Sequence, residues 1–312
     1  MTTQIYINNT SDMAPQKLEG ILVALITPFT EGGKEIDAGQ LDVHINNLIA
    51  AGVHGLVPGG STGEFTTLSN AERKTLLELC IKSAAGRVPV VAGIGALSTA
   101  DALDLATHAA HAGADALMVV PPFYDPLTVP QLHEYFADIH AAAPHLALMY
   151  YNIPGASGVA LSPAELAGLR AAGVTHLKDT SGNGPALTEL LFGLQDEITA
   201  FNGWDTLTFY ALCAGAKGGI WGATNVIPEL SMRLWDAVAV RGDLGEGRRV
   251  WAKIWPVCKF FETHMYHAAV KTGMELRGFR TGGVRKPFKL LEGAEREELA
   301  GLLRAAGVEV VV

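Results

Sequence analysis

The residue with the clearest chemical potential is Lys178, which ends the apolar segment 174–178 and precedes the turn-forming residues 179–182. A charged amine is rarely buried without a partner. A lysine at the end of a buried strand therefore either reaches solvent at the rim or serves as a nucleophile. As a nucleophile, its neutral amine would attack a carbonyl group and form a Schiff base. The surrounding residues decide between these two interpretations.

Eight short apolar segments alternate with helical patterns from residue 21 onward. Each segment is continuously apolar, as expected of strands that are buried on both faces. They cover residues 21–27, 53–58, 88–92, 114–120, 146–151, 174–178, 198–202 and 218–222. Strands that alternate with helices indicate parallel βαβ units. Eight such units predict an α/β fold, a (β/α)8 TIM barrel, and this count disfavours the alternative, an open doubly wound sheet.

Helical patterns lie between these segments and continue beyond them. Those between strands cover residues 37–51, 69–85, 98–112, 129–143, 162–172, 185–194 and 205–214. After Pro228 only helical patterns follow, near residues 230–240, 246–261, 265–275 and 295–306. The sequence thus predicts a polar N-terminal tail (1–19), a catalytic barrel (20–236) and a C-terminal helical domain (237–312).

Reactive side chains follow the strands at the end where TIM-barrel active sites lie. They belong to the segments GGSTGE (59–64), PPFY (121–124), YYN (150–152), KDT (178–180), NGWD (202–205) and GATN (222–225). This convergence favours the nucleophilic interpretation of Lys178. Asp179 follows directly, so in a strand it points the other way and receives no catalytic role.

The chemistry of such a site follows from the residue types. A free lysine titrates near pH ~10.4, and burial favours its neutral, nucleophilic form. After attack on a ketone, the iminium accepts the electrons of a neighbouring bond that breaks, while the phenol of Tyr151 can carry protons. Amides of residues 60–63, with the hydroxyls of Ser61 and Thr62, can hold a carboxylate. The plainer alternatives are a tight turn for the glycines and a core aromatic for Tyr151.

Three motifs together resemble the dihydrodipicolinate synthase / N-acetylneuraminate lyase family: GGSTGE (59–64), YYNIPG (150–155) and LKDTSG (177–182). The resemblance covers nearly all of residues 18–312. It implies a (β/α)8 barrel and a Schiff-base mechanism that needs no cofactor and no metal. It also implies a pyruvate-type 2-oxo acid, an aldehyde partner and a homotetramer built as a dimer of dimers.

The resemblance also assigns roles to individual residues. Lys178 matches the Schiff-base lysine, Tyr151 the proton-relaying tyrosine, and Ser61 and Thr62 the hydroxyls that hold the carboxylate. Tyr124 matches a tyrosine that family members lend to a neighbouring subunit. We therefore expect Lys178, Tyr151, Thr62 and Tyr124 to be catalytic. Substrate contacts are expected from Ser61, Gly60, Thr180, Gly203, Asp205, Ala156, Ser157 and Asn225.

Two positions depart from well-known members of that family. Dihydrodipicolinate synthases carry an arginine two residues after the proline of their YNxP motif, whereas GASG (155–158) follows Pro154 here. Sialate lyases carry Asp-Glu after the seventh strand, whereas here Trp204 precedes Asp205 and no glutamate follows. These departures argue against lysine biosynthesis and favour an aldehyde that is smaller or more apolar than the sugar of sialic acid.

We therefore expect a lyase or aldolase that acts on a 2-keto-3-deoxy acid or a 4-hydroxy-2-oxo acid. Two alternatives of the same class are a decarboxylating dehydratase of a 2-keto-3-deoxy sugar acid and a condensation like that of 4-hydroxy-tetrahydrodipicolinate synthase. The alternative from another class is a non-catalytic barrel that binds 2-oxo acids.

The composition excludes other classes. The chain has 312 residues, a net charge of −9 and a pI of about 5.6, so we expect no nucleic-acid partner. Neither a leader-like start nor an apolar run of ~18 residues occurs, so we expect no membrane association. Cys80, Cys213 and Cys258 are widely spaced, which indicates buried thiols and a cytoplasmic location. The ten histidines, including the pair His264/His267, show no metal-ligand spacing and are interpreted as helix-surface residues.

Overall fold

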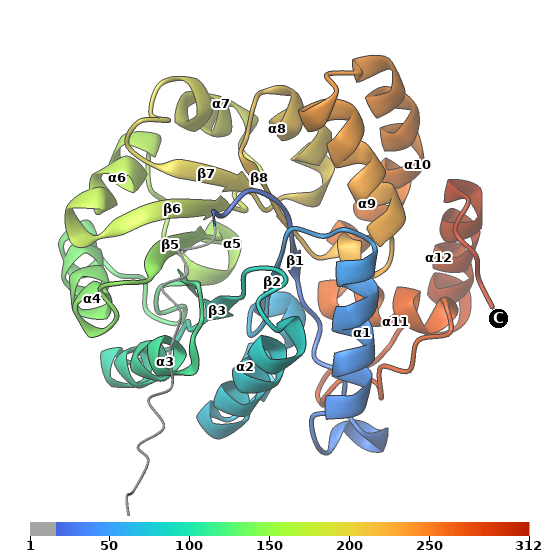
Figure 1. The fold of residues 1–312 in the computed structure, drawn as a ribbon, viewed down its shortest axis with the longest axis horizontal. Coiled ribbons are helices and arrows are strands. Elements are labelled where there is room, and N and C mark those ends of the chain that lie inside the picture. The colour runs from blue at the N-terminus through green and yellow to red at the C-terminus, as the bar shows by residue number, and fades with distance from the viewer. Residues whose placement is uncertain (1–16, 312) are drawn as a thin grey trace, which may run out of the picture.

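The computed structural model describes residues 17–311, so most of the expected N-terminal tail, residues 1–16, and residue 312 lie outside the described residues. Eight parallel strands follow the order β2-β1-β8-β7-β6-β5-β4-β3. A parallel bridge between Leu56 and Val90 brings β2 beside β3 and closes the ring. The predicted TIM barrel is thereby confirmed (Figure 1). The strands are β1 (Gly20–Ala24), β2 (Gly55–Val57), β3 (Val91–Gly93), β4 (Ala116–Val119), β5 (Ala147–Asn152), β6 (Val174–Asp179), β7 (Thr199–Asn202) and β8 (Gly218–Trp221).

Strands β5 and β6 each run one residue further than the apolar pattern predicts. Asn152 pairs with Asp179 in the ladder, and its Nδ2 donates a hydrogen bond of 2.8 Å to Oδ1 of Asp179. This polar pair extends the strands beyond their apolar residues. It also fixes the height at which the two preceding residues, Tyr151 and Lys178, leave the sheet.

Helices on the outside of the barrel connect successive strands (Figure 1). Their starts follow ordinary capping chemistry: Ser69 and Glu72 form a capping box at the start of α2. A short helix, α5 (Pro154–Ser157), follows β5 and has no counterpart in the apolar pattern. The others are α1 (Ala38–Ala50), α2 (Asn70–Ala84), α3 (Thr99–Ala112), α4 (Val129–Ala142), α6 (Pro163–Gly168), α7 (Gly184–Phe192) and α8 (Thr208–Cys213).

The C-terminal helices gather at one side of the barrel, next to α1 (Figure 1). They are α9 (Pro228–Trp235), α10 (Leu244–Thr263), α11 (Tyr266–Leu276) and α12 (Gly293–Ala306). They share an apolar core with Ile21 of β1 and Trp221 of β8. The domain boundary predicted after residue 236 falls within a continuous helical stretch, because a π-helical turn (Asp236–Val240) continues α9, and it remains a prediction. Within residues 17–311, no helix combines the length and apolarity needed to cross a membrane.

Side chains of each strand alternate between the barrel interior and the layer under the outer helices. Met149 and Tyr151 belong to the interior cluster. Tyr150 belongs to the outer cluster and lies 5.3 Å from Phe136, measured between ring centroids. One thiol departs from expectation: Cys213 is exposed because it ends α8 on the solvent side, although Cys80 and Cys258 are buried.

Candidate active site

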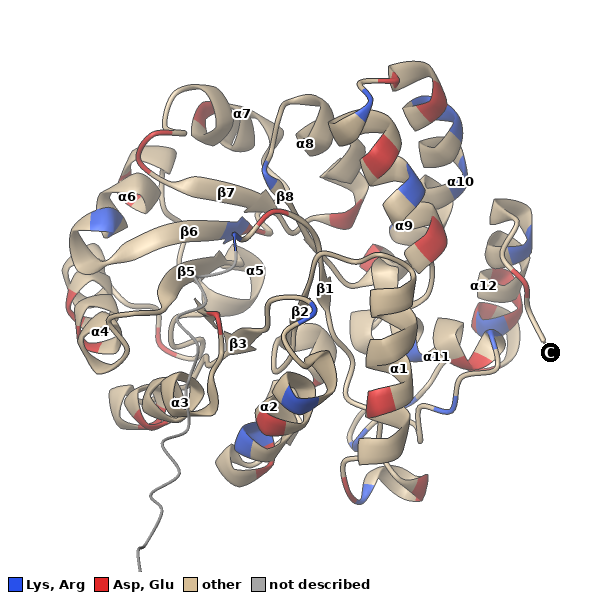
Figure 2. Ribbon diagram, viewed as in Figure 1, with Lys and Arg blue, Asp and Glu red and all other residues tan. Residues whose placement is uncertain are grey.

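Among the eight described strands, β6 alone carries lysine, arginine or acidic residues, Lys178 and Asp179. Figure 2 shows this charge at the carboxyl end of β6, whereas other charged residues gather on the surrounding helices and loops. Because neighbouring side chains point to opposite faces, Lys178 enters the barrel and Asp179 faces outward. Asp179 accepts hydrogen bonds from Asn152 and Ser181, so its carboxylate is engaged outside the barrel interior.

Lys178 stands between aromatic residues of the two neighbouring strands. In the ladder Lys178 pairs with Tyr151 of β5 on one side and with Phe201 of β7 on the other. Its Nζ lies 4.0 Å from the centroid of the Tyr151 ring. Lys178 exposes only 5% of its surface, so it does not extend into bulk solvent. This geometry brings an amine and a phenol together in an apolar setting.

A cavity of about 240 Å³ opens above these two residues. Its lining includes seven of the twelve residues expected at the site, together with residues that were not expected to contact the substrate. The expected ones are Ser61, Thr62, Tyr151, Lys178, Thr180, Gly203 and Asp205. The others are Ala24, Ile153, Trp204, Ile220, Gly222, Glu262, Met265, Tyr266 and His267.

Five expected residues do not line the cavity: Gly60, Tyr124, Ala156, Ser157 and Asn225. The amide of Asn225 is engaged elsewhere. Its Nδ2 donates to the carbonyl oxygens of Ala24 and Gly222 at 2.8 and 2.7 Å, and its Oδ1 accepts from the amide of Ile26 at 3.3 Å. Asn225 therefore ties the end of β1 to the loop after β8. The hydroxyl of Ser157 likewise donates to a main-chain carbonyl, that of Ile153, at 3.1 Å.

Tyr124 exposes 84% of its surface. It lies in the loop after β4, beside a separate surface cleft that also contains Leu97 and Tyr135. Within one chain it does not join the cavity. Its expected contribution to a neighbouring subunit's site remains a prediction.

One wall of the cavity comes from the C-terminal helices. Glu262 lies near the end of α10, while Met265, Tyr266 and His267 lie at the start of α11. His267 is buried, which corrects its interpretation as a helix-surface histidine. No motif in the sequence predicted this wall.

Asp205 and Tyr266 form a buried polar pair in this wall. The hydroxyl of Tyr266 donates to Oδ2 of Asp205 at 2.7 Å. Burial raises the pKa of Asp205 to about 7; the Tyr266 hydrogen bond lowers it and the charge of Glu262 raises it. Burial also raises the pKa of Tyr266. At neutral pH the Asp205 carboxyl is therefore divided between its neutral and ionised forms.

The raised pKa of Asp205 predicts a pH-dependent stability that Asp205→Asn should remove. Between pH ~4 and ~7 the unfolded chain releases this proton while the native state keeps it, so stability falls as pH rises. From pH 5 to pH 8 we expect the wild type to lose roughly 3 kcal/mol relative to the variant. Urea unfolding at both pH values measures the difference. Asp196→Asn, at an exposed position, serves as the control, and parallel profiles for wild type and Asp205→Asn would contradict the assignment.

Gly203 allows Lys178 to lie where it does. A Cβ atom at this position would lie 2.8 Å from Cε of Lys178 and 2.2 Å from Oγ1 of Thr180. Any side chain at 203 must therefore displace the side chain of Lys178 or the hydroxyl of Thr180. The absence of a side chain is thus a requirement of the site.

Gly203→Ala should consequently lower kcat by roughly 10²-fold, because a shift of about 1 Å in a reacting group has an effect of this size. Steady-state kinetics measure the change, and the melting temperature shows whether the fold survives. Gly155→Ala is the matched control, because a Cβ at Gly155 meets no atom within 4 Å. Equal activity of the two variants would show that the close approach is unimportant.

The fold and the cavity define an α/β barrel with an enclosed lysine at the carboxyl end of its sixth strand. The chain belongs to the dihydrodipicolinate synthetase family, whose model matches residues 17–306. The family resemblance noted in the motifs is thereby confirmed.

The chain also aligns with individual relatives along most of their length. The chain is 35% identical over 291 residues to a 4-hydroxy-tetrahydrodipicolinate synthase of Methanopyrus kandleri, covering 92% of this chain and 95% of the relative. It is 37% identical over 292 residues to a protein of the same name from Rhodospirillum centenum, covering 93% and 98%. Dihydrodipicolinate synthase from Acinetobacter baumannii complexed with pyruvate superposes with a TM-score of 0.88 at 30% identity, covering 94% and 100%. YagE from E. coli K12 in complex with pyruvate gives 0.88 at 28% identity, covering 93% and 99%.

Proposed function

We propose that the protein is a class I lyase that forms a Schiff base between Lys178 and a pyruvate-type 2-oxo acid, and that it acts on a 2-keto-3-deoxy acid or a 4-hydroxy-2-oxo acid. The observation that carries the proposal is the buried amine of Lys178, 4.0 Å from the ring of Tyr151. Two solved relatives described as complexes with pyruvate support it.

The proposed reaction assigns a task to each of four side chains. The amine of Lys178 attacks the C2 carbonyl carbon, and loss of water from the resulting carbinolamine leaves an iminium. Tyr151 transfers the protons, while Ser61 and Thr62 hold the carboxylate. The iminium takes up the electron pair of the breaking C3–C4 bond, which releases an aldehyde and leaves an enamine. Protonation at C3 and hydrolysis of the imine then free pyruvate and the amine.

The charges in the cavity favour an uncharged aldehyde partner. Among the described residues, Lys178 is the sole lysine or arginine in the lining, whereas Asp205 and Glu262 contribute two carboxyl groups. A carboxylate or phosphate on the aldehyde would meet acidic groups without a compensating cation. Neutral hydroxyl groups could instead hydrogen bond to them. The expected aldehyde is therefore a small, neutral hydroxyaldehyde.

The size of the cavity supports the same substrate class. Its volume of about 240 Å³ is below the ~300–1,000 Å³ typical of larger ligands. Trp204 narrows it and is held in place, because its Nε1 donates to Thr206 at 3.1 Å. The hydroxyl and amide of Thr206 in turn donate to the carboxylate of Glu262 at 3.0 and 2.8 Å. This arrangement favours an aldehyde smaller than the sugar of sialic acid.

Two other reactions have specific support. The names of the curated relatives favour a 4-hydroxy-tetrahydrodipicolinate synthase. Against it, residues 155–158 contain no arginine and Ala156 is exposed outside the cavity. The carboxyl of Asp205, with its pKa near 7, supports a dehydratase, because a neutral acid can protonate a departing hydroxyl.

Product analysis separates these reactions. The enzyme is incubated with pyruvate and either glyceraldehyde or succinic semialdehyde, which carries a carboxylate, and the products are identified by mass spectrometry. We expect a condensation product with glyceraldehyde that contains the carbon atoms of both reactants. A preference for the charged aldehyde would favour the synthase. In a separate incubation with a keto-deoxy sugar acid, loss of water together with one carbon atom as CO2 would favour the decarboxylating dehydratase. Reversible binding of pyruvate without any adduct trapped by borohydride would favour the non-catalytic 2-oxo-acid-binding barrel.

A homotetramer and a cytoplasmic location remain predictions of the family resemblance and the composition. Gel filtration with light scattering would test the first of these.

A further inference from the structure

A fully buried ion pair lies behind the turn that carries Ser61 and Thr62. The side chains of Glu64 and Lys271 are both 0% exposed, and Nζ of Lys271 lies 2.5 Å from Oε1 of Glu64. The same ammonium donates to the carbonyl oxygen of Gly283 at 2.8 Å and lies 4.1 Å from the centroid of the Phe29 ring. The charges of Glu64 and Lys271 are thus both shielded from water, and neither residue lines the cavity.

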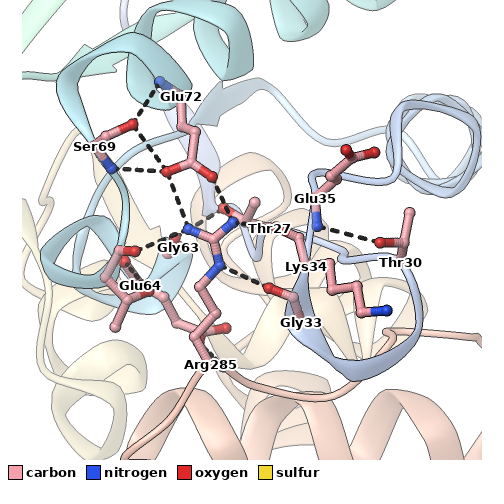
Figure 3. Close-up of polar contacts among 11 residues, drawn as sticks. Thr27, Thr30, Gly33, Lys34, Glu35, Gly63, Glu64, Ser69, Glu72 and Arg285 are labelled. Atoms are coloured by element: carbon pink, nitrogen blue, oxygen red, sulfur yellow. Dashed lines mark hydrogen bonds and ion pairs between the residues drawn. The ribbon is translucent and has the colours of Figure 1, made fainter.

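Arg285 anchors the second oxygen of the same carboxylate. Its main-chain amide donates to Oε2 of Glu64 at 3.1 Å. Its guanidinium binds both oxygens of Glu72 and donates to the carbonyl oxygens of Gly33 and Thr67, each at 2.9 Å (Figure 3). The segment after α11 is thereby fastened to the loops that follow β1 and β2.

Glu64 closes the turn on which the two hydroxyl residues stand. Its backbone adopts φ 57° and ψ 35°, a left-handed conformation that few residues other than glycine adopt. In this conformation its amide donates to the carbonyl oxygen of Ser61 at 3.1 Å. Thr27, just beyond β1, donates to the carbonyl of the preceding residue, Gly63, at 2.8 Å. A displacement of Glu64 would therefore be transmitted directly to Ser61 and Thr62.

Stability alone is a weak reason for this arrangement. A buried ion pair often stabilises a fold no more than apolar residues of the same volume, because desolvation of the charges offsets their attraction. An apolar pair, however, could not hold a carboxylate between a lysine and a backbone amide in a fixed direction. The arrangement is suited to orientation, since each carboxylate oxygen has a separate partner from the C-terminal segment.

We propose that Lys271 and Arg285 are positioning residues of the active site, which hold Glu64 and thereby aim the hydroxyls of Ser61 and Thr62 at the carboxylate of the 2-oxo acid. This inference rests on the proposed function, because it takes that carboxylate to be the ligand of the turn. It gives the C-terminal helices a second task, separate from the wall that Glu262 and Tyr266 provide.

The double variant Glu64→Gln/Lys271→Met tests the proposal, because it removes both charges and leaves neither one buried alone. We expect the KM for pyruvate to rise at least about tenfold, while kcat at saturating pyruvate changes much less. Borohydride should still trap pyruvate on Lys178 at saturating concentration. A merely structural role would lower the melting temperature and leave KM within twofold of wild type, and this result overturns the proposal.

A second, milder variant keeps the test decisive if the double variant does not fold. Glu72→Gln weakens the anchor of Arg285 at its partly exposed end and should raise the KM for pyruvate about threefold. An unchanged KM for this variant overturns the proposal where the double variant gives no folded protein. Lys289→Met, at an exposed position of the same segment, is the charge-matched control and should leave KM unchanged. The wild type separates the two hypotheses: if it yields no pyruvate adduct, the proposed function itself has failed.

Discussion

Replacement of Lys178 by alanine is expected to abolish the pyruvate adduct and to lower kcat by at least about 10³-fold. The reason is the isolation of this amine. Among the described residues, no other lysine or arginine lines the cavity, so no second amine can take over the attack on the carbonyl carbon. Mass spectrometry after borohydride reduction in the presence of pyruvate measures the adduct, and steady-state kinetics measure turnover.

Lys217→Ala is the matched control for this substitution. Lys217 is exposed and directly precedes β8, at the end of the barrel opposite to the cavity. This variant should keep both the adduct and the turnover of the wild type. A trapped adduct on Lys178→Ala would mean that another amine is the nucleophile and would overturn the mechanism proposed above.

Tyr151→Phe is expected to lower kcat by about 10²–10⁴-fold, the range that is typical for the loss of a proton-transferring group. The ring would still pack beside Lys178, because β5 and β6 hold the two residues in register, but the phenolic proton would be absent. Formation of the adduct should slow by a similar factor and still reach completion over long incubation. Rapid-quench trapping with borohydride follows this rate.

The neighbouring Tyr150 provides an internal control with the same chemistry. It points away from the interior, and its buried hydroxyl has no hydrogen-bond partner among the described residues. Tyr150→Phe therefore removes no bond and should change kcat by less than about twofold, because removal of a polar atom without a partner is nearly neutral. Equal losses for Tyr150→Phe and Tyr151→Phe would show that packing of β5, and not proton transfer, explains the effect.

The barrel and the centre of its site could be predicted because they depend on local patterns. Continuous apolar segments marked all eight strands, and parallel strands bring their carboxyl ends to one edge. Residues that directly follow strands, such as Ser61, Thr62 and Lys178, could therefore be placed together from the sequence alone. Their presence in one cavity requires only that the strands are correctly identified.

The wall formed by α10 and α11 could not be predicted in this way. An amphipathic pattern shows that one face of a helix is buried, but it does not say which element covers that face. Glu262 and Tyr266 lie about sixty residues further along the chain than Asp205. The sequence therefore contained no sign that they lie close to it in the structure. Asn225 shows the opposite difficulty: the sequence predicted a substrate contact, but this residue does not line the cavity. It stands at the same end of the barrel as Asp205, but nearby main-chain groups already satisfy its amide.

The wall from the last helices also affects when the enzyme becomes competent during its synthesis. Translation proceeds from the N-terminus, so all eight strands leave the ribosome before Glu262, Tyr266, Lys271 and Arg285. Until this late segment folds back onto the barrel, the amine of Lys178 lies in a cavity that lacks one wall, and the turn at 61–64 has no support from the C-terminal segment. Catalysis should therefore begin only after residues 262–285 have emerged, well after the barrel strands themselves.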